Sequence, residues 1–323
     1  MSSSSLTASG IREDSPISSQ PSSAAILDRK PNASRRNIAW FGWALVLPAC
    51  SFVLALNIFP ALFTIVTSFF RWNFVNKRIP PRFVFLGNYQ ELLFSEPLLP
   101  QAVLNTLFFI LGTVSLQVVA GVAIAMLLNQ GLRGTRVATA LLLIPMAIAP
   151  AVIAWLFSIL LNEALGPVNY ALQALNLSAP PWLSDARWAL PTIVLVDAWQ
   201  WTPFIVIISL AGLRSQPPSV FEAAMLDGAN ARQRFRYITL PLLRPVLIIA
   251  ILLRTVDAFK MFDLVYLLTG GGPGTSSQTL SLYGYRLGVV QFDVGRGSTV
   301  STIMLMIAMA FAILFYRAAR VRQ

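Results

Sequence analysis

The chain has 323 residues, of which 56% are hydrophobic and only 11% charged, with a mean hydropathy of +0.68. Soluble domains carry about a quarter charged residues, so an ordinary soluble protein is excluded and an integral membrane protein is indicated. The basic residues behind the net charge of +11 are dispersed over loops beside apolar runs, which fits lipid contact and excludes a nucleic-acid partner. With no histidine and one cysteine, Cys50, we expect no metal site and no disulfide.

Residues 1–38 are rich in serine, proline and charge and predict a disordered tail. The rest, 39–323, predicts one transmembrane domain, because its apolar runs have the ~20 residues that a bilayer requires. We predict six helices in an all-α fold, since a strand facing lipid leaves its backbone unpaired. The spans lie near 39–70, 102–128, 137–161, 188–212, 242–268 and 299–316.

Basic residues set the orientation of these spans. The N-terminal tail, the second and fourth loops and the C-terminal tail hold fifteen, and the first, third and fifth loops hold seven. Both termini are therefore expected in the cytoplasm. The glycine-rich run at 269–274 lacks the Lys-Ser/Thr and the strand-to-helix context of a phosphate-binding loop, so it predicts an outer turn.

The longest cytoplasmic loop, 213–241, contains EAAMLDGANARQRFRYITLP. Ser219 and Glu222 have the spacing of a capping box, which predicts a helix starting at 219–220. Gly228 predicts a turn, and a second short helix follows at 229–238, with Pro241 at the entry to the fifth span. We call residues 219–241 the shelf.

Two interpretations of the shelf are open. Its arginines suit an amphipathic hairpin lying on lipid headgroups. Its acidic residues, Glu222 and Asp227, would then face an anionic leaflet. A protein partner with an apolar and basic groove satisfies them better.

Charged residues inside the fifth span are costly and therefore informative. Arg254 and Asp257 are i, i+3 neighbours near the middle of the bilayer, and Lys260 and Asp263 follow at the same interval. They predict either an internal ladder of ion pairs that fixes helix packing or polar groups that face a water-filled cavity.

A resemblance now becomes specific. The pattern Glu-Ala-Ala, three residues, Gly, nine residues, Ile-x-Leu-Pro is present without a gap from Glu222 to Pro241. It resembles the signature loop of the membrane subunits of binding-protein-dependent ABC importers, which docks on the ATPase subunit. FEAAMLDGANARQRFRYITLPLLRP, WQWTPFIVIISLAGL and the glycine-proline run after the fifth span resemble the carbohydrate branch, maltose/trehalose type, the first of two non-identical permeases.

The resemblance implies a type I ABC importer permease in a bacterial inner membrane, importing a sugar or oligosaccharide. The implied partners are a second permease, two ATP-binding cassette subunits and an extracytoplasmic sugar-binding protein. ATP and Mg would bind the ATPase subunits, leaving this chain without a cofactor or catalytic role. The alternative is an ion-driven secondary transporter, with Asp257 and Asp197 as titrating carboxylates, but the shelf then has no purpose.

The resemblance also implies two sets of site residues. Glu222 anchors the shelf, apolar residues fill a cleft and Gly228 sets the bend, so the coupling set is Phe221, Glu222, Ala223, Ala224, Met225, Leu226, Asp227 and Gly228. The substrate set, carried over from the maltose-type cavity, is Arg254, Asp257, Ala258, Met261, Gln200, Trp201, Phe204 and Met146, with Ala149 or Pro150 as further positions. Aromatic faces cover the C–H patches of a sugar while polar groups meet its hydroxyls.

Overall fold

The computed structural model describes residues 40, 46–75, 80–131 and 133–320, and most of them are helical. The predicted tail, 1–38, lies outside the described residues. Residues 1–60 and 61–323 pack as two separate units, which are described one at a time.

The first unit contains the start of a 22-residue apolar helix, Val46–Thr67. This helix includes a π-helical turn, η2 (Leu54–Ile58), and ends in α2 (Phe59–Thr67). Phe52 and Phe59 are exposed on it, as expected for side chains that contact lipid.

The described residues contain five helices long and apolar enough to cross a membrane, and a bent pair provides a sixth. Besides Val46–Thr67, the single helices are α4 (Leu98–Leu128), α8 (Ala189–Arg214), the run Ala231–Phe259 and α14 (Val294–Arg320). The bent pair is α5 (Thr135–Ala147) and α6 (Pro150–Leu160). The prediction of six apolar spans agrees with this set.

The third predicted span, 137–161, is broken instead of continuous. Its two halves, α5 and α6, meet at 97°. Ile148 and Ala149 both have ψ of 137°. Ala149 precedes Pro150 and therefore avoids the helical region, and Pro150 opens α6. Gln200 on α8 donates from Nε2 to the Ile148 carbonyl oxygen at 3.0 Å, which satisfies a backbone acceptor freed by the break.

The fifth predicted span, 242–268, has different limits in the structure. One helix runs from α10 (Ala231–Arg234) through the π-helical turn η4 (Phe235–Thr239) into α11 (Leu240–Phe259), and α12 (Asp263–Leu268) is separate. Pro241 lies in the first turn of α11, at the predicted entry to the fifth span, but α10 and η4 precede it in the same continuous helix. The wider hydrogen-bond pairing of η4 precedes Pro241, where the missing amide would interrupt ordinary helical pairing.

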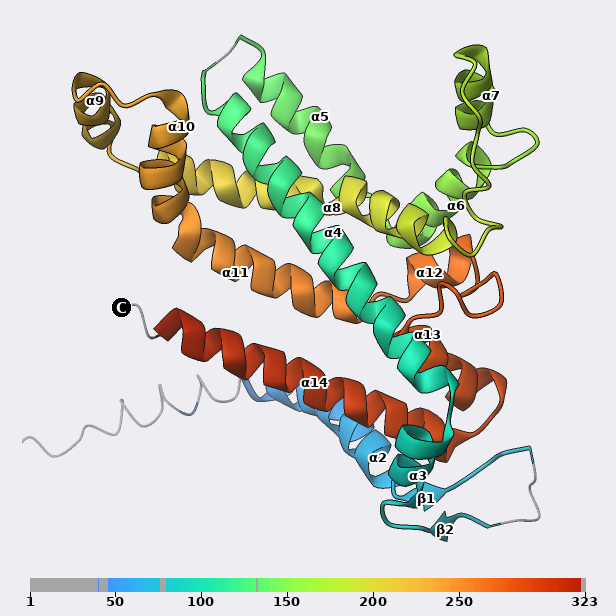
Figure 1. The fold of residues 1–323 in the computed structure, drawn as a ribbon. Coiled ribbons are helices and arrows are strands. Elements are labelled where there is room, and N and C mark those ends of the chain that lie inside the picture. The colour runs from blue at the N-terminus through green and yellow to red at the C-terminus, as the bar shows by residue number, and fades with distance from the viewer. Residues whose placement is uncertain (1–39, 41–45, 76–79, 132, 321–323) are drawn as a thin grey trace, which may run out of the picture. The chain divides into compact units, whose positions relative to one another are not determined.

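In the second unit α8 packs against α4, α5 and α11 (Figure 1). The approach of α4 to α8 is close at Gly121, where a β-carbon would lie 2.7 Å from Cβ of Ile205. Small residues permit such contacts between membrane helices. This packing brings the middle of α4, α8 and α11 together.

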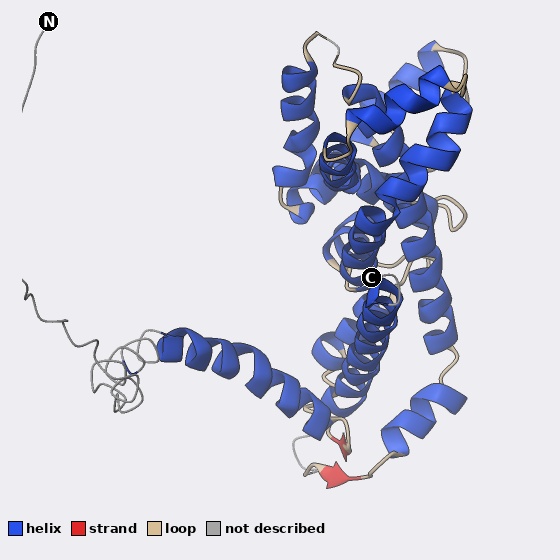
Figure 2. Cartoon of the chain, turned by 90° about the vertical axis from the view of Figure 1, so that its left-hand side faces the viewer, coloured by secondary structure: helices blue, strands red, loops and turns tan. Residues whose placement is uncertain are grey.

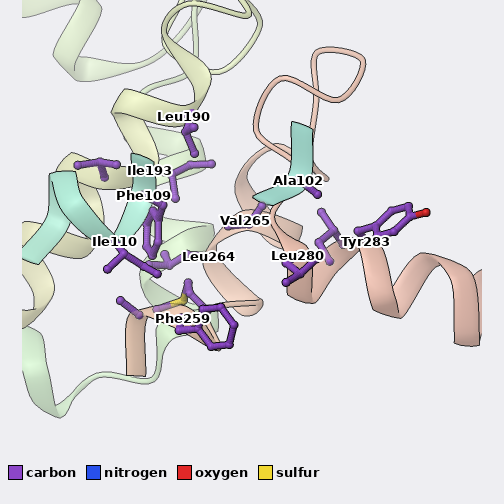
Figure 3. Packing of buried hydrophobic residues seen from close by; sticks show 14 of the residues in the cluster. Ala102, Phe109, Ile110, Leu190, Ile193, Phe259, Leu264, Val265, Leu280 and Tyr283 are labelled. Carbon is purple, nitrogen blue, oxygen red and sulfur yellow. The ribbon is translucent and has the colours of Figure 1, made fainter. Parts of the chain in front are cut away.

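Two apolar clusters stabilise this unit. The first joins Phe109 of α4, Ile193 of α8 and Leu264 of α12, and Figure 3 shows Phe109, Ile193 and Leu264 in it. The second contains Ile205 of α8 and Leu243 of α11. Apolar burial from four helices therefore surrounds the polar groups described below.

The remaining elements belong to the loops. The loop between Val46–Thr67 and α4 holds a two-stranded antiparallel pair, β1 (Phe70–Arg71) and β2 (Arg82–Phe83), drawn red in Figure 2. This pair is a small exception to the all-α prediction. The loop helices are α3 (Gly87–Gln90), η3 (Glu91–Ser95), α7 (Pro167–Ala174), α9 (Pro218–Leu226), α13 (Leu280–Tyr285) and η5 (Arg286–Val290).

Candidate functional site

The first arm of the shelf is α9, which begins at Pro218 with Pro217 as its N-cap. No side chain caps this helix, so the predicted capping box of Ser219 and Glu222 is wrong. Pro218 is pre-organised for the first helical position, which starts the helix early enough to place Ser219 inside it.

The turn at Gly228 is confirmed. Its φ is +76°, in the left-handed region that favours glycine. The Gly228 amide donates to the Met225 carbonyl at 3.1 Å and the Ala229 amide to the Ala224 carbonyl at 2.9 Å. These two bonds form a Schellman motif, which ends α9 and fixes the direction of the next arm.

The second arm starts with a true capping box that the sequence prediction missed. The Gln233 amide donates to Oδ1 of Asn230 at 2.9 Å, and the Asn230 amide donates to Oε1 of Gln233 at 2.8 Å. From there the helix continues without interruption into α11. In Figure 1, α9 and α10 adjoin the ends of α8 and α11.

The shelf presents an unusual mixture of exposed side chains. Met225 and Leu226 are 53% and 90% exposed, whereas Ala224 is buried. The carboxylates of Glu222 and Asp227 are exposed and form no ion pair with the described residues. Exposed apolar and acidic groups on a rigid hairpin are typical of a surface that docks on a protein.

The second group of interest is a buried polar cluster around Arg254 of α11, whose side chain is only 2% exposed. The guanidinium donates from Nε to Oε1 of Gln117 at 2.9 Å, from Nη2 to Oδ2 of Asp197 at 2.8 Å and from Nη1 to Oδ2 of Asp257 at 2.6 Å. Three helices, α4, α8 and α11, therefore meet at one arginine.

Asp197 of α8 receives further hydrogen bonds from α4. Thr113 donates to Oδ2 of Asp197 through its hydroxyl, and Nε2 of Gln117 donates to the same oxygen at 3.0 Å. A buried ion pair stabilises a fold only when additional hydrogen bonds offset the loss of hydration. The side chains of Thr113 and Gln117 supply those bonds here.

The charges in the cluster are one cation and two anions. Trp201 adds a cation–π contact, with Cζ of Arg254 4.9 Å from the ring centroid. Asp197 is fully buried, while the side chain of Asp257 is 49% exposed. Asp257 and the half-buried Trp201 are therefore the members of the cluster with side-chain surface that a ligand can reach.

The structure brings together part of the predicted substrate set. Arg254, Asp257 and Trp201 are in one cluster, but Ala258 and Met261 are buried in the first apolar cluster. Phe204 packs against the second apolar cluster, Gln200 binds the break after α5, and Met146 is half-buried in α5.

The predicted ladder does not extend beyond Asp257. Lys260 and Asp263 are both exposed, and they form no ion pair with the part of the chain that the structure describes. The helix ends at Phe259, just before Lys260, and Asp263 begins the separate helix α12. Of the two interpretations, the internal ion pair is confirmed for Arg254 alone.

Sequence reasoning missed two members of the cluster, Thr113 and Gln117, and considered Asp197 only for an ion-driven transporter. A signal was present, because Gln117 is a polar residue inside an apolar span. The sequence did not show which of several such residues face one another.

Comparisons with known proteins agree with this geometry. Residues 117–321 match the model of the family described as "Binding-protein-dependent transport system inner membrane component". A trehalose/maltose transport system permease protein from Thermococcus litoralis is 36% identical over 88% of this chain and 95% of its own. A sulfoquinovosyl glycerol transport system permease protein from Agrobacterium fabrum is 32% identical over 86% and 90%.

Solved structures show the same fold. A chain of a bacterial ABC transporter that imports the acidic polysaccharide alginate matches with a TM-score of 0.77 and 20% identity, over 90% of this chain and 98% of that chain. The matched family segment contains the shelf and, from the polar cluster, Gln117, Asp197, Arg254 and Asp257. These findings set aside the ion-driven alternative, and the chain belongs to the family of inner-membrane components of binding-protein-dependent transport systems.

Proposed function

We propose that this chain is one of two permease subunits of an ATP-driven importer of a sugar or oligosaccharide. The observation that carries the proposal is the shelf, a rigid hairpin whose apolar and acidic side chains are exposed and whose second arm is continuous with α11. Relatives of this chain include permeases of a trehalose/maltose and of a lactose transport system, which supports a sugar as cargo.

The proposed partners follow from the number of spans, because six spans form only half of a translocation path through the membrane. A second permease completes the path, two ATP-binding cassette subunits hydrolyse ATP, and an extracytoplasmic sugar-binding protein delivers the cargo. Structures of similar fold include an alginate transporter in complex with its periplasmic protein. On this proposal ATP and Mg bind the ATPase subunits, and this chain binds no cofactor and performs no covalent chemistry.

The coupling step transmits ATPase closure through the shelf. Phe221, Met225 and Leu226 fill an apolar cleft on the ATPase, and Glu222 meets a basic group there. The second arm and α11 form one helix, so a displacement of the shelf passes to Arg254 over 23 residues, about 35 Å at 1.5 Å per residue. The docking residues on α9 connect to this helix through the turn at Gly228, which the two Schellman bonds fix.

The substrate contact centres on Asp257 and Trp201. The free part of the Asp257 carboxylate accepts hydrogen bonds from sugar hydroxyls, and the indole of Trp201 covers a C–H face. Arg254 holds Asp257 in place and is already matched by two carboxylates. A neutral sugar therefore suits the site better than an acidic one, with Gln200, Phe204, Met146, Ala258 and Met261 as supporting wall positions.

Purification and transport test the proposal together. The full-length chain is expressed with an affinity tag in cells that also produce the proposed partner subunits. We expect an ATPase and a second permease to copurify with it. Uptake by vesicles with the binding protein and labelled neutral oligosaccharides should require ATP and be inhibited by vanadate. Uptake driven by an ion gradient without ATP contradicts the proposal.

A further inference from the structure

Three aromatic rings contact one another just beyond the end of α11. The rings of Phe262 and Tyr266 stack with their centroids 5.2 Å apart and an angle of 13° between their planes. The ring of Tyr285 meets both of them, with its centroid 4.9 Å from that of Phe262 and 5.5 Å from that of Tyr266. We call these three residues the aromatic cluster. In Figure 1, α12 lies at the end of α11 away from α9 and α10, so the aromatic cluster is remote from the shelf.

The surrounding chain holds these rings in place. The Tyr266 amide donates to the Phe262 carbonyl at 2.9 Å, and this i, i+4 spacing puts the two side chains on one face of α12. The Ser281 hydroxyl of α13 donates to the Met261 carbonyl, which ties the helix that ends in Tyr285 to the start of α12. Phe262 and Tyr285 also pack against the first apolar cluster. The aromatic cluster is therefore a fixed part of the fold.

Tyr266 is the exposed member of the aromatic cluster. It is 44% exposed, whereas Phe262 and Tyr285 are half-buried. Phe262 covers one face of the Tyr266 ring, and the exposed fraction leaves ring surface that a ligand can reach. An aromatic face carries partial negative charge and attracts the partly positive C–H groups of a sugar ring. Tyr266 can therefore provide a stacking surface for a saccharide.

Charged side chains accompany this ring. Asp263 lies three residues before Tyr266, so the two are neighbours on α12. The Asp263 carboxylate is exposed and forms no ion pair among the residues that the structure describes, so it can accept hydrogen bonds from hydroxyls beside the ring. Lys260 and Asp257 precede it at the same interval and are exposed as well. Ionisable groups in membrane proteins face protein or water-filled cavities and not hydrocarbon, so this row indicates a wet surface that leads from Asp257 to the aromatic cluster.

We propose that the aromatic cluster and Asp263 form a second sugar subsite, in which a pyranose ring stacks on Tyr266. A saccharide held there lies on its way to the contact with Asp257 and Trp201. The inference rests on the proposed function, which supplies the sugar and its path. A ring face beside a carboxylate suits a neutral saccharide, because Asp263 repels an acidic one. The subsite holds sugar that the binding protein has released and so reduces its escape from the path.

The number of sugar molecules imported per ATP hydrolysed tests the proposal, because this ratio does not depend on how much of the complex folds. Vesicles with the assembled transporter receive excess binding protein and maltose, trehalose or lactose, whichever saccharide the parent imports fastest. Tyr266→Ala should lower the ratio about fivefold, since a stacking contact of about 1 kcal/mol corresponds to that factor. Tyr266→Phe keeps the ring and should retain most of the parent ratio. Tyr170→Ala removes the same side chain from an exposed position of α7 and should leave the ratio unchanged.

Two further measurements test other occupants of this surface. Tyr266→Cys, in a chain with Cys50→Ser, should react with a membrane-impermeant thiol reagent added on the side of the binding protein. Absence of this reaction shows that lipid or the second permease covers the cluster, and it overturns the proposal. Less assembled complex from Tyr266→Ala in gel filtration assigns the cluster to a subunit interface and overturns it too. Equal ratios in Tyr266→Ala and the parent reject the subsite, while ATP-driven uptake by both leaves the proposed function intact.

Discussion

At the scale of single residues, the central feature is a fully buried arginine that three helices share. Arg254 is tolerated because Gln117, Asp197 and Asp257 accept its hydrogen bonds and Trp201 covers its face. The two aspartates differ in environment, since Asp197 is buried and Asp257 is half-exposed. This difference predicts separable roles in stability and transport.

Asp197→Asn should destabilise the assembled permease. Breaking a buried pair by removing one partner costs about 3–5 kcal/mol, because the other charge stays buried without full compensation. We expect a clearly lower melting temperature and less assembled complex, measured by thermal shift and by gel filtration. Unchanged stability in this variant contradicts the structural role of Asp197.

Asp257→Asn is the matched substitution at the exposed end of the same cluster. Its effect on stability should be small, about 1 kcal/mol or less, as for ion pairs in contact with solvent. Its effect on transport should be larger, because the carboxylate contacts the sugar in our proposal. Vesicle uptake measured at several sugar concentrations checks this. If the variant reaches half-maximal uptake at the same sugar concentration as the wild type, Asp257 does not belong to the substrate site.

At the scale of elements, close contacts between helices decide the positions of the polar groups. Gly121 permits α4 to approach α8 near Ile205, and this approach brings Gln117 of α4 within reach of Asp197 and Arg254. The break between α5 and α6 is similarly tied to α8 through Gln200.

Gly121→Val tests the contact between α4 and α8. The new side chain would overlap Ile205, and overpacking of this kind costs about 1–3 kcal/mol. We expect a lower melting temperature of the purified complex. Ala120→Val adds a similar side chain at an exposed neighbouring position and should leave the melting temperature unchanged, whereas equal effects of both variants refute the argument.

Asn230→Ala tests the capping box of the second arm. Loss of a side-chain cap costs about 1 kcal/mol, so the first turn of α10 should open more often. Hydrogen exchange of the Gln233 amide should become about fivefold faster, while exchange in the middle of α11 stays the same. If exchange at Gln233 is unaffected, the capping bonds contribute nothing in solution.

At the scale of the whole molecule, the second arm of the shelf and Arg254 of the polar cluster lie on one continuous helix, Ala231–Phe259. We expect a force on α9 to pass through the turn at Gly228 and then along this helix to Arg254. A switch of this type needs only a few kcal/mol of differential docking between two states of the ATPase.

Glu222→Lys tests this coupling. The reversed charge should repel the basic docking site, and a loss of about 1.4 kcal/mol corresponds to a tenfold weaker association. We expect sugar uptake to fall about tenfold or more while the chain still inserts and the ATPase subunits still hydrolyse ATP. Glu163→Lys makes the same exchange at an exposed position of the loop between α6 and α7 and should transport normally; normal uptake by Glu222→Lys instead argues against coupling through the shelf.

Much of the fold and part of the site could be predicted from the sequence. The six apolar runs, the turn at Gly228 and the family resemblance of the shelf depend on local composition and short spacings. The capping box of Ser219 and Glu222 was misassigned because Pro218 starts α9 before Ser219, and the box of Asn230 and Gln233 on the next helix was missed although it has the same spacing.

The sequence by itself determined that this chain spans a membrane repeatedly and carries a shelf typical of one importer family, because hydrophobic length and local motifs need no knowledge of distant contacts. Only the tertiary structure decided which polar residues meet. Arg254 is 57 residues from Asp197 and 137 from Gln117. Such partners are chosen by helix packing, through close approaches such as Gly121 against Ile205, and not by any local pattern.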